Sequence, residues 1–379
     1  MPDWSFHHPT FISFGTGILQ KAPTLIEGDR IAVITSPGFT RRGVTSQLRQ
    51  SFGARLVEVV DTVQPNPDID DIDEMAARLK PLRPDCLVGF GGGSSLDTAK
   101  ALARLLVDPQ QPTLGEYFRD NKPFGREESL PVVAIPTTAG TGAEVTPFAT
   151  IWDFQAKKKY SLSETDIHPE QAIIDPGLAS TLPRRITISS GLDTISHAFE
   201  SIWNQNANPI SLSFATQALV LAWEALPQLI DDGDAGTARA RMAQASLLAG
   251  LAISQTRTAL AHSMSYPLTT HFGLPHGVAC SFSLAELLRF NAATDDGRLQ
   301  RVATVLGYAE AGDLANALDE FLLEVGADEL FAECVPTVSE VLSLTGEMYT
   351  PERAENNMRP ATDTDMAALV ESAAEAMLR

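Results

Sequence analysis

The spacing of apolar residues changes near Ser180, and this change constrains the fold more than any other feature of the sequence. Before Ser180, short apolar runs alternate with helical patterns, and the clearest runs are RIAVIT, RLVEVVD, CLVGF and PVVAIPTT. After it, stretches such as ISLSFATQALVLAWEALPQLI are apolar at helical spacing, and strand-like runs almost vanish. The sequence therefore predicts an α/β domain with a parallel sheet, followed by an all-α domain.

The length of the chain also favours two domains, because 379 residues exceed one ordinary hydrophobic core. We place the α/β domain at residues 1–180 and the helical domain at residues 181–379. One antiparallel element is expected in the first domain, where FATIWDFQAKKKYSLS predicts a hairpin that turns around Gln155-Ala156-Lys157.

The charge balance and the cysteine content restrict the partners and the compartment. A net charge of −20 argues against nucleic acid or an anionic membrane as a partner, and an anionic substrate would need a local basic pocket. The N-terminus has no signal-like apolar core, and no uninterrupted apolar run approaches the length of a membrane span. Three scattered cysteines form neither a disulfide framework nor a CxxC metal site. We therefore expect a reduced, cytoplasmic protein.

Two glycine-rich loops follow buried strands of the expected sheet. Gly91 to Gly93 join CLVGF to a helix, so backbone N–H groups at the helix start can approach a pyrophosphate. The second loop, PTTAGTGAEVT, follows PVVAIPTT and is rich in threonine and glycine. Either loop alone could be only a tight turn. Because parallel strands end at one edge of a sheet, the two loops together predict a nucleotide cofactor.

Four candidate ligands for one divalent metal ion lie between Gly191 and Gly277. Asp193 and His197 are four residues apart in a helical pattern and share a face of that helix. His262 lies in a second helical pattern, and His276 lies in a turn bounded by glycine and proline. Each histidine alone could be an ordinary core or surface residue. One carboxylate and three imidazoles suit Fe2+ or Zn2+.

The order and spacing of these motifs resemble the iron-dependent (group III) alcohol dehydrogenases over nearly the whole chain. The matching motifs are GGGSSLDTAK, PTTAGTGAEVTPFA, the end of the KKKY hairpin, AIIDPGL, GLDTISHAFE, HSMSYPL, HFGLPHGVA and ERAENNMRPAT. The resemblance implies a dinucleotide-binding N-terminal domain, a helical metal- and substrate-binding domain, and an active site in the cleft between them. It also implies an oxidoreductase, commonly a homodimer, in which a metal ion polarises a carbonyl group and a reduced nicotinamide delivers hydride.

The same resemblance assigns roles to individual residues. The metal ligands are expected to be Asp193, His197, His262 and His276. The residues expected to contact the cofactor come from both glycine-rich loops and the hairpin: Gly92, Gly93, Ser94, Asp97, Thr137, Thr138 and Lys159.

Tyr266 stands where the family usually has a histidine that relays a proton. A tyrosine donates a proton but is a poor base near neutrality. This departure favours aldehyde reduction, or a relay through another group such as His271. Tyr266 could also simply pack beside the cofactor.

Arg257 stands where the family commonly has a glycine, five residues before His262. Its planar guanidinium suits a phosphonate, sulfonate or carboxylate, although a salt bridge to an acidic residue is the alternative. The segments around both ligand helices look most like the phosphonoacetaldehyde reductases of the family. We therefore expect phosphonoacetaldehyde to be reduced to 2-hydroxyethylphosphonate. Sulfoacetaldehyde reduction, a general short-chain alcohol dehydrogenase, and a lyase of the dehydroquinate-synthase type are the alternatives.

The turn after the first strand bears on the choice of cofactor. Members specific for NAD often carry an aspartate near the position of Ser36, where it binds the ribose and repels a 2′-phosphate. Its absence here, with Arg41 and Arg42 close by, permits NADPH. Both arginines could instead be solvated residues at a helix start, so NADH remains an alternative.

Overall fold

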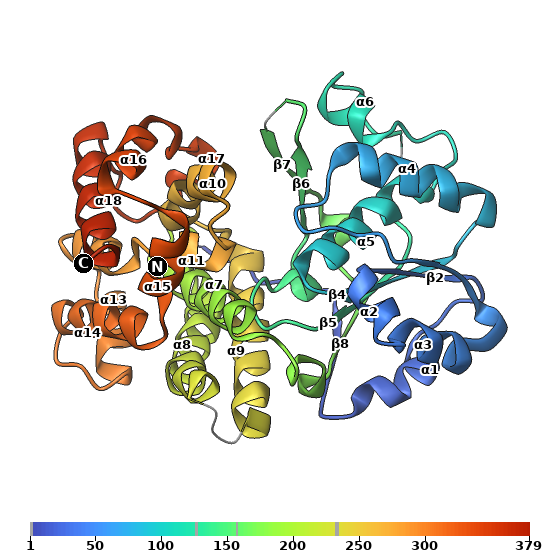
Figure 1. Cartoon of the computed structure of the whole chain (residues 1–379), viewed down its shortest axis with the longest axis horizontal. Coiled ribbons are helices and arrows are strands. Elements are labelled where there is room, and N and C mark those ends of the chain that lie inside the picture. Colours follow the sequence, from blue (N-terminus) through green and yellow to red (C-terminus); the bar gives the residue numbers. More distant parts are fainter. Residues whose placement is uncertain (1–2, 126–127, 157, 232–234) are drawn as a thin grey trace. The chain divides into compact units, whose positions relative to one another are not determined.

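The computed structural model describes residues 3–125, 128–156, 158–231 and 235–379, which fall into two compact units (Figure 1). One unit comprises residues His7–Thr138 and Ala143–Ala179. The other comprises residues 3–6, Ala139–Gly142 and Ser180–Arg379. The first is an α/β unit and the second is helical, so the predicted fold class is confirmed. The sequence did not indicate that Ala139–Gly142 belongs to the helical unit.

The α/β unit is built on one sheet in which every neighbouring pair of strands is parallel. The strand order is β1-β8-β5-β4-β2-β3. The strands are β1 (Phe11–Phe14), β2 (Ile31–Thr35), β3 (Leu56–Val60), β4 (Cys86–Gly91), β5 (Val132–Pro136) and β8 (Gln171–Ile174). All residues of the central strands β2, β4 and β5 are buried, which explains why their sequences are continuous apolar runs.

Helices supply the apolar side chains that bury the sheet. The helices of this unit are α1 (Ala22–Leu25), α2 (Pro37–Arg41), α3 (Val44–Phe52), α4 (Ile69–Leu79), α5 (Gly93–Leu106) and α6 (Leu114–Phe118). Ile72 and Leu102 join Leu87 in one apolar cluster, while Leu48 and Val88 lie in another. Because side chains of a strand alternate between its two faces, Leu87 and Val88 assign these clusters to opposite faces.

The predicted hairpin is present as β6 (Phe148–Asp153) and β7 (Lys158–Ser163), which pair antiparallel. Lys157, in its expected turn, lies outside the described residues. The hairpin is attached to α5, since the backbone N–H of Thr150 donates to Asp97 at 2.9 Å and Lys100 Nζ donates to the carbonyl of Phe148 at 2.7 Å.

The helical unit begins with three long helices that pack against one another, α7 (Arg184–Ile202), α8 (Pro209–Ile230) and α9 (Ala235–Thr256). The later helices are α10 (Leu260–Phe272), α11 (His276–Ser281), α12 (Leu284–Ala292), α13 (Arg298–Val305), α14 (Ala311–Glu324), α15 (Ala327–Cys334), α16 (Val338–Ser343), α17 (Pro351–Ala354) and α18 (Asp363–Met377). Among the described residues, α8 is the one helix long and apolar enough to cross a membrane by length and composition. Its buried residues Ala218, Leu219 and Ala222 belong to the core of this unit, as in the core helix of a soluble protein.

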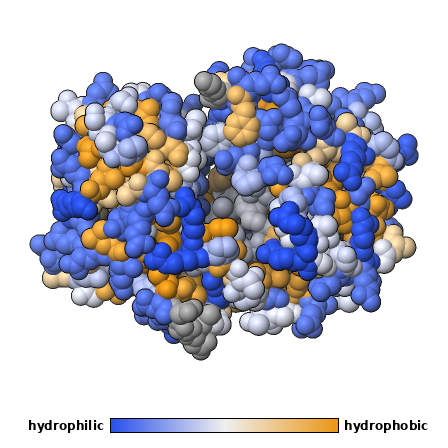
Figure 2. Space-filling model, viewed as in Figure 1, coloured by the Kyte–Doolittle hydropathy of each residue, from blue (hydrophilic) through white to orange (hydrophobic). Residues whose placement is uncertain are grey.

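The face shown in Figure 2 is mainly polar, with smaller apolar areas. Among the large apolar side chains that stay exposed are Phe11 and Phe14, whose exposed fractions are 66% and 40%. Both lie on β1, an edge strand of the sheet. Exposed aromatic residues on a sheet edge are candidates for contact with another chain.

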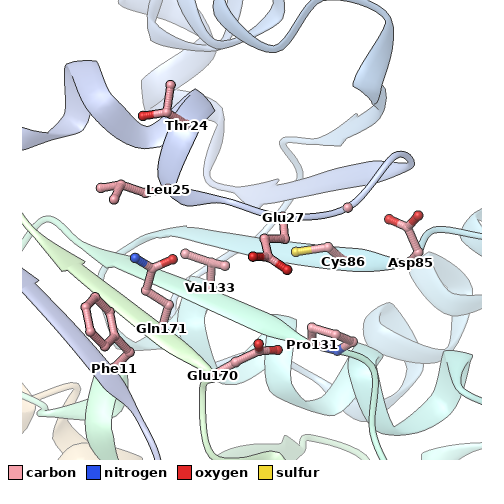
Figure 3. A pocket seen from close by; sticks show the side chains of 11 residues that line it. Phe11, Thr24, Leu25, Glu27, Asp85, Cys86, Pro131, Val133, Glu170 and Gln171 are labelled. Carbon is pink, nitrogen blue, oxygen red and sulfur yellow. The ribbon is translucent and has the colours of Figure 1, made fainter.

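A cavity of about 550 Å³ opens where β4, β5 and β8 begin (Figure 3). Cys86, Val133 and Gln171 line it, together with the carboxylates of Glu27 and Glu170. None of the predicted cofactor residues lines this cavity, and the loops that carry most of them follow the opposite, carboxyl ends of the strands. Ligands of open parallel sheets bind at those carboxyl ends, so we do not identify the cavity with the cofactor site.

Candidate active site

Helix α7 carries Asp193 and His197 one turn apart, and each is only 4% exposed. The Nε2 atom of His197 lies 3.6 Å from Asp193 Oδ1. The Nδ1 atom of His197 lies 3.2 Å from the carbonyl oxygen of Gly140. Because a carbonyl oxygen only accepts, Nδ1 carries the proton, and the lone pair of Nε2 is directed toward Asp193.

His262 enters the same cluster from α10. Its Nε2 lies 3.5 Å from Asp193 Oδ1, and its ring stacks on that of His197 with centroids 4.8 Å apart. Its Nδ1 bonds Glu200 Oε2 at 2.5 Å, and its backbone N–H donates to Glu200 Oε1 at 3.0 Å. Burial alone would raise the pKa of Glu200, but the His262 imidazole and these hydrogen bonds hold it below its ordinary value. A carboxylate behind a histidine is a common outer partner of a metal ligand.

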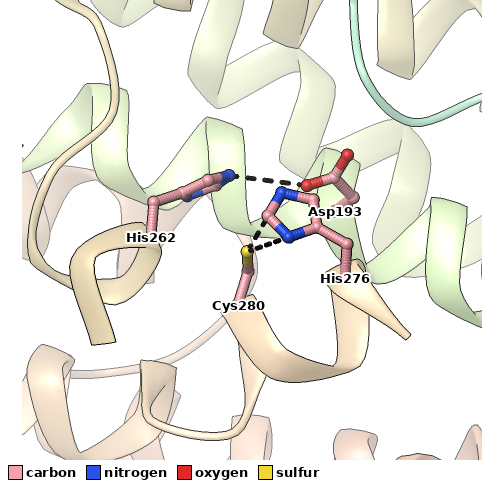
Figure 4. Close-up of side chains that lie close together, drawn as sticks. All are labelled: Asp193, His262, His276 and Cys280. Atoms are coloured by element: carbon pink, nitrogen blue, oxygen red, sulfur yellow. Dashed lines mark hydrogen bonds and ion pairs between the residues drawn. The ribbon is translucent and has the colours of Figure 1, made fainter. Parts of the chain in front are cut away.

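His276 and Cys280 complete the cluster from α11, one turn apart. One donor atom from each of Asp193, His262, His276 and Cys280 lies within 4.8 Å of the others (Figure 4). The close packing of α11 on α7 depends on Gly277, because a Cβ there would lie 1.7 Å from the carbonyl oxygen of Ser189. The sequence analysis did not identify Cys280 as a donor, although its spacing of four residues from His276 was an available signal.

The cluster fits a divalent metal ion. Asp193 Oδ1 and His262 Nε2 are both buried and have no hydrogen-bond partner among the described residues. Unpaired buried polar atoms are costly, and a cation bound between them would satisfy both. Burial opposes ionisation of Asp193, yet the surrounding imidazoles hold its pKa far below the ordinary value, so a carboxylate is available as ligand.

The two glycine-rich loops lie side by side at the carboxyl edge of the sheet. The backbone N–H of Thr137 donates to the carbonyl of Gly91 at 2.9 Å, and Thr138 Oγ1 would lie 3.5 Å from a Cβ on Gly92. Gly91 has a φ of 153°, and a Cβ there would lie 2.5 Å from Ser95 Oγ, so a side chain would not be tolerated. Gly92 is the N-cap residue of α5, and Gly93 and Ser94 form its first turn. Their N–H groups therefore surround a helix N-terminus, which suits a phosphate.

The remaining predicted cofactor residues lie nearby in the same unit. Ser36 is the N-cap residue of α2, directly after β2. Asp97 accepts a hydrogen bond from the hairpin at Thr150, and its Oδ1 lies 3.7 Å from Lys100 Nζ. Lys159 Nζ lies 5.5 Å from the centroid of the Trp152 ring. The contact of Asp97 joins α5 to the hairpin, and that of Lys159 lies within the hairpin, so a structural role stands beside the cofactor role that the resemblance implies.

The predicted substrate residues are distributed unequally around α10. Tyr266 is half-buried and lies one turn after His262. His271 is nine residues from His262, which is half a turn out of phase, and it therefore lies on the opposite face of the helix. It is 44% exposed, and its Nε2 lies 3.0 Å from Glu347 Oε2. The structure thus brings Tyr266 to the His262 side of α10 and leaves His271 at the surface.

Arg257 follows α9 directly and has a left-handed backbone, with φ at 64°. Its N–H donates to the carbonyl of Ile253 at 2.8 Å, and this closes the helix in the way a glycine usually does. The usual glycine of the family at this position thus has a conformational reason. An arginine here costs about 1 kcal/mol of backbone strain, and strain of this kind is frequent at functional sites.

The fold and this cluster together define a metal-dependent dehydrogenase of the α/β plus helical type. Comparison with known families agrees. The family described as iron-containing alcohol dehydrogenase matches residues 9–176, and the C-terminal model of the Fe-containing alcohol dehydrogenase family matches residues 187–374. The chain belongs to the iron-containing alcohol dehydrogenase family and is an oxidoreductase of that class.

Two relatives and one solved structure bear on the substrate. The chain is 34% identical to a phosphonoacetaldehyde reductase of Streptomyces viridochromogenes, over 91% of this chain and 88% of that protein. It is 30% identical to a sulfoacetaldehyde reductase of Bilophila wadsworthia, over 81% and 80% of the two chains. Among solved structures, the sulfoacetaldehyde reductase of Bifidobacterium kashiwanohense in complex with NAD+ is 28% identical, with a TM-score of 0.90 and coverage of 99% of both chains.

Proposed function

We propose that this enzyme reduces a small anionic aldehyde with NADPH or NADH, using Fe2+ or Zn2+ bound by Asp193, His197, His262 and His276. The lead substrate is phosphonoacetaldehyde, and the product is 2-hydroxyethylphosphonate. The observation that carries the proposal is the buried donor cluster, in which Asp193 Oδ1 and His262 Nε2 have no other partner among the described residues. Sulfoacetaldehyde is the second candidate, since a sulfoacetaldehyde reductase is also among the relatives.

Residues of the chain orient the metal-binding imidazoles and supply a proton for the reduction. When bound, the metal ion supplies Lewis-acid polarisation of the carbonyl group, and the nicotinamide supplies the hydride. Glu200 fixes the His262 ring through Nδ1, and the Gly140 carbonyl does the same for His197, so that both Nε2 atoms face Asp193. The Tyr266 hydroxyl is the proton donor for the product oxygen, because Tyr266 lies one turn from His262 on the same side of α10.

The anionic part of the substrate requires a cation near this site, because the chain as a whole has a net charge of −20. Arg257 was the predicted cation, and its side chain is exposed. Its strained backbone supports a functional reason for an arginine at this position. The proposal also includes a homodimer in the cytoplasm, and the exposed Phe11 and Phe14 on the edge strand β1 support the dimer.

The experiment that tests the proposal measures NADPH and NADH oxidation by the Fe2+-loaded and Zn2+-loaded enzyme. Phosphonoacetaldehyde, sulfoacetaldehyde and propanal are compared at equal concentrations. We expect kcat/KM to be about 10- to 150-fold higher for one of the anionic aldehydes, since a charge-assisted contact contributes about 1.5–3 kcal/mol. Equal turnover of propanal would show a general short-chain alcohol dehydrogenase instead.

A further inference from the structure

Arg353 was not identified from the sequence, although it lies in the same unit as the metal cluster. It belongs to the short helix α17, and its side chain is half-buried. Its Nη1 donates to Thr258 Oγ1 at 3.3 Å, and its guanidinium carbon lies 5.6 Å from the centroid of the Tyr266 ring. Thr258 is four residues before His262 and Tyr266 four residues after it. The guanidinium therefore contacts residues on both sides of His262 in the sequence.

The segment that carries Arg353 is attached firmly to α10. Ser263 Oγ donates to the carbonyl of Met348 at 2.7 Å and accepts from the N–H of Thr350 at 2.6 Å. On the other side of Arg353, Asn356 Nδ2 donates to the carbonyl of Thr258 at 2.8 Å. Hydrogen bonds before and after Arg353 thus fix its backbone, and a positioned guanidinium loses little freedom when it binds an anion.

Within the part of the chain that the structure describes, the charge of Arg353 lacks a counter-ion. Over the described ranges, no carboxylate lies within ion-pair distance of its guanidinium, although this chain has 48 acidic residues. Arg55 and Arg239 are also half-buried without a carboxylate partner among the described residues, whereas two other arginines of low exposure do have one. Arg289 pairs with Glu286 at 2.9 Å, and Arg104 pairs with Glu164 at 2.8 Å. A half-buried cation without a counter-ion can accept an anionic ligand, and Arg353 is set apart by its contacts with Thr258 and Tyr266, on either side of His262 in the sequence.

We infer that Arg353, with the Thr258 hydroxyl beside it, forms the site that binds the phosphonate or sulfonate group of the substrate. Its planar fork can donate two parallel hydrogen bonds to two oxygens of a tetrahedral anion, and Thr258 Oγ1 can donate a third. Arg257, which is exposed, contributes a supporting positive charge. This inference rests on the proposed function, because it names the residue that selects an anionic aldehyde over a neutral one.

The test compares Arg353→Ala and Arg353→Lys with Arg241→Ala as the matched control, since Arg241 is a half-buried arginine of α9 paired with Glu224. The metal-loaded enzyme is assayed with phosphonoacetaldehyde, sulfoacetaldehyde and propanal. Arg353→Ala is expected to lower kcat/KM for the preferred anionic aldehyde by on the order of 100-fold, mainly through KM, and to leave propanal within about threefold. Arg353→Lys is expected to retain part of the kcat/KM for the anionic aldehyde that Arg353→Ala loses. Arg241→Ala is expected to leave kcat/KM unchanged for every aldehyde tested.

The possible outcomes distinguish an error in the proposed substrate from an error in the assignment of Arg353. If the wild-type enzyme prefers propanal, the proposed anionic substrate is wrong whatever Arg353 does. If the wild type prefers an anionic aldehyde and Arg353→Ala retains that preference, the proposed function stands and the assignment of Arg353 is wrong. If Arg353→Ala lowers kcat/KM equally for the anionic aldehyde and for propanal, Arg353 acts through Tyr266 or the fold, and the assignment is again wrong. Calorimetric binding of 2-hydroxyethylphosphonate to the metal-loaded enzyme gives a readout independent of turnover, and Arg353→Ala is expected to weaken it by a similar factor.

Discussion

Glu200 holds His262 by two hydrogen bonds, one to the imidazole Nδ1 at 2.5 Å and one from the backbone N–H at 3.0 Å. Both residues are buried, and the second ring nitrogen of His262 is directed at Asp193. The carboxylate therefore fixes both the orientation and the tautomer of a predicted metal ligand, as outer partners of metal-bound histidines commonly do.

Replacing this carboxylate should weaken metal binding. We expect Glu200→Gln to lower the affinity for Zn2+ or Fe2+ by about 10- to 100-fold, because the amide can orient the ring but carries no charge. The measurement is the metal content after dialysis against a graded series of chelator concentrations. Glu224→Gln, an exposed change on α8, is the control. Unchanged metal retention in Glu200→Gln would mean that Glu200 only packs beside the site.

Removal of the metal should destabilise the helical unit. A bound ion stabilises the folded state by mass action and satisfies Asp193 Oδ1 and His262 Nε2, which otherwise stay unpaired. We expect a chelator to lower Tm by several degrees and re-addition of Zn2+ to restore it. The same treatment of Asp193→Asn should produce a much smaller shift. An identical shift in that variant would place the stabilising ion elsewhere.

Gly277 should tolerate no side chain. A Cβ would lie 1.7 Å from the Ser189 carbonyl oxygen, which is a backbone atom and cannot move aside as a flexible side chain could. We expect Gly277→Ala to cost at least about 3 kcal/mol of unfolding free energy and to displace His276 from the cluster. Denaturant titration measures the first effect and metal content the second. Gly346→Ala, where a Cβ meets nothing within 4 Å, is the control and should change stability little.

Arg257→Gly should raise stability while it removes a charge. The φ of 64° is strained for arginine and free of strain for glycine, so we expect a gain of up to about 1 kcal/mol in the free energy of unfolding. Arg257→Ala loses the same charge but keeps the strain, and it should show no such gain. If both variants have the stability of the wild type, the strain is relieved in solution.

Glu144 should make stability depend on pH in the α/β unit. Burial raises the pKa of Glu144 from 4.5 to about 7, although Lys100 partly opposes the shift. The folded state thus binds more protons than the unfolded state between these values. The resulting stabilisation is complete below pH 4.5 and is lost as pH rises through 7. Over this window Glu144→Gln should gain up to about 3 kcal/mol relative to wild type. Denaturant titrations at pH 5 and pH 8 measure the difference, and a pH-independent difference would contradict the assignment.

Part of the site followed directly from local spacing. The i, i+4 relation of Asp193 and His197 placed both on one face of α7, and parallel strands brought the loops at Gly92 and Thr137 to one edge of the sheet. Helical periodicity also determines the position of His271, which was expected near the site. Nine residues separate His271 from His262, so the two cannot share a face of α10.

The sequence by itself determined the fold class, the family and the phase of each predicted ligand along its own helix, because these depend on periodicity and on motifs of neighbouring residues. Only the tertiary structure placed Cys280 beside Asp193, Glu200 behind His262, and Arg353 over Tyr266. Arg353 and Tyr266 are separated by 87 positions of chain, and no helical or strand period extends over such a distance. Their contact depends on how the α17 segment packs on α10, and that packing is decided by the hydrogen bonds of Ser263 and Asn356.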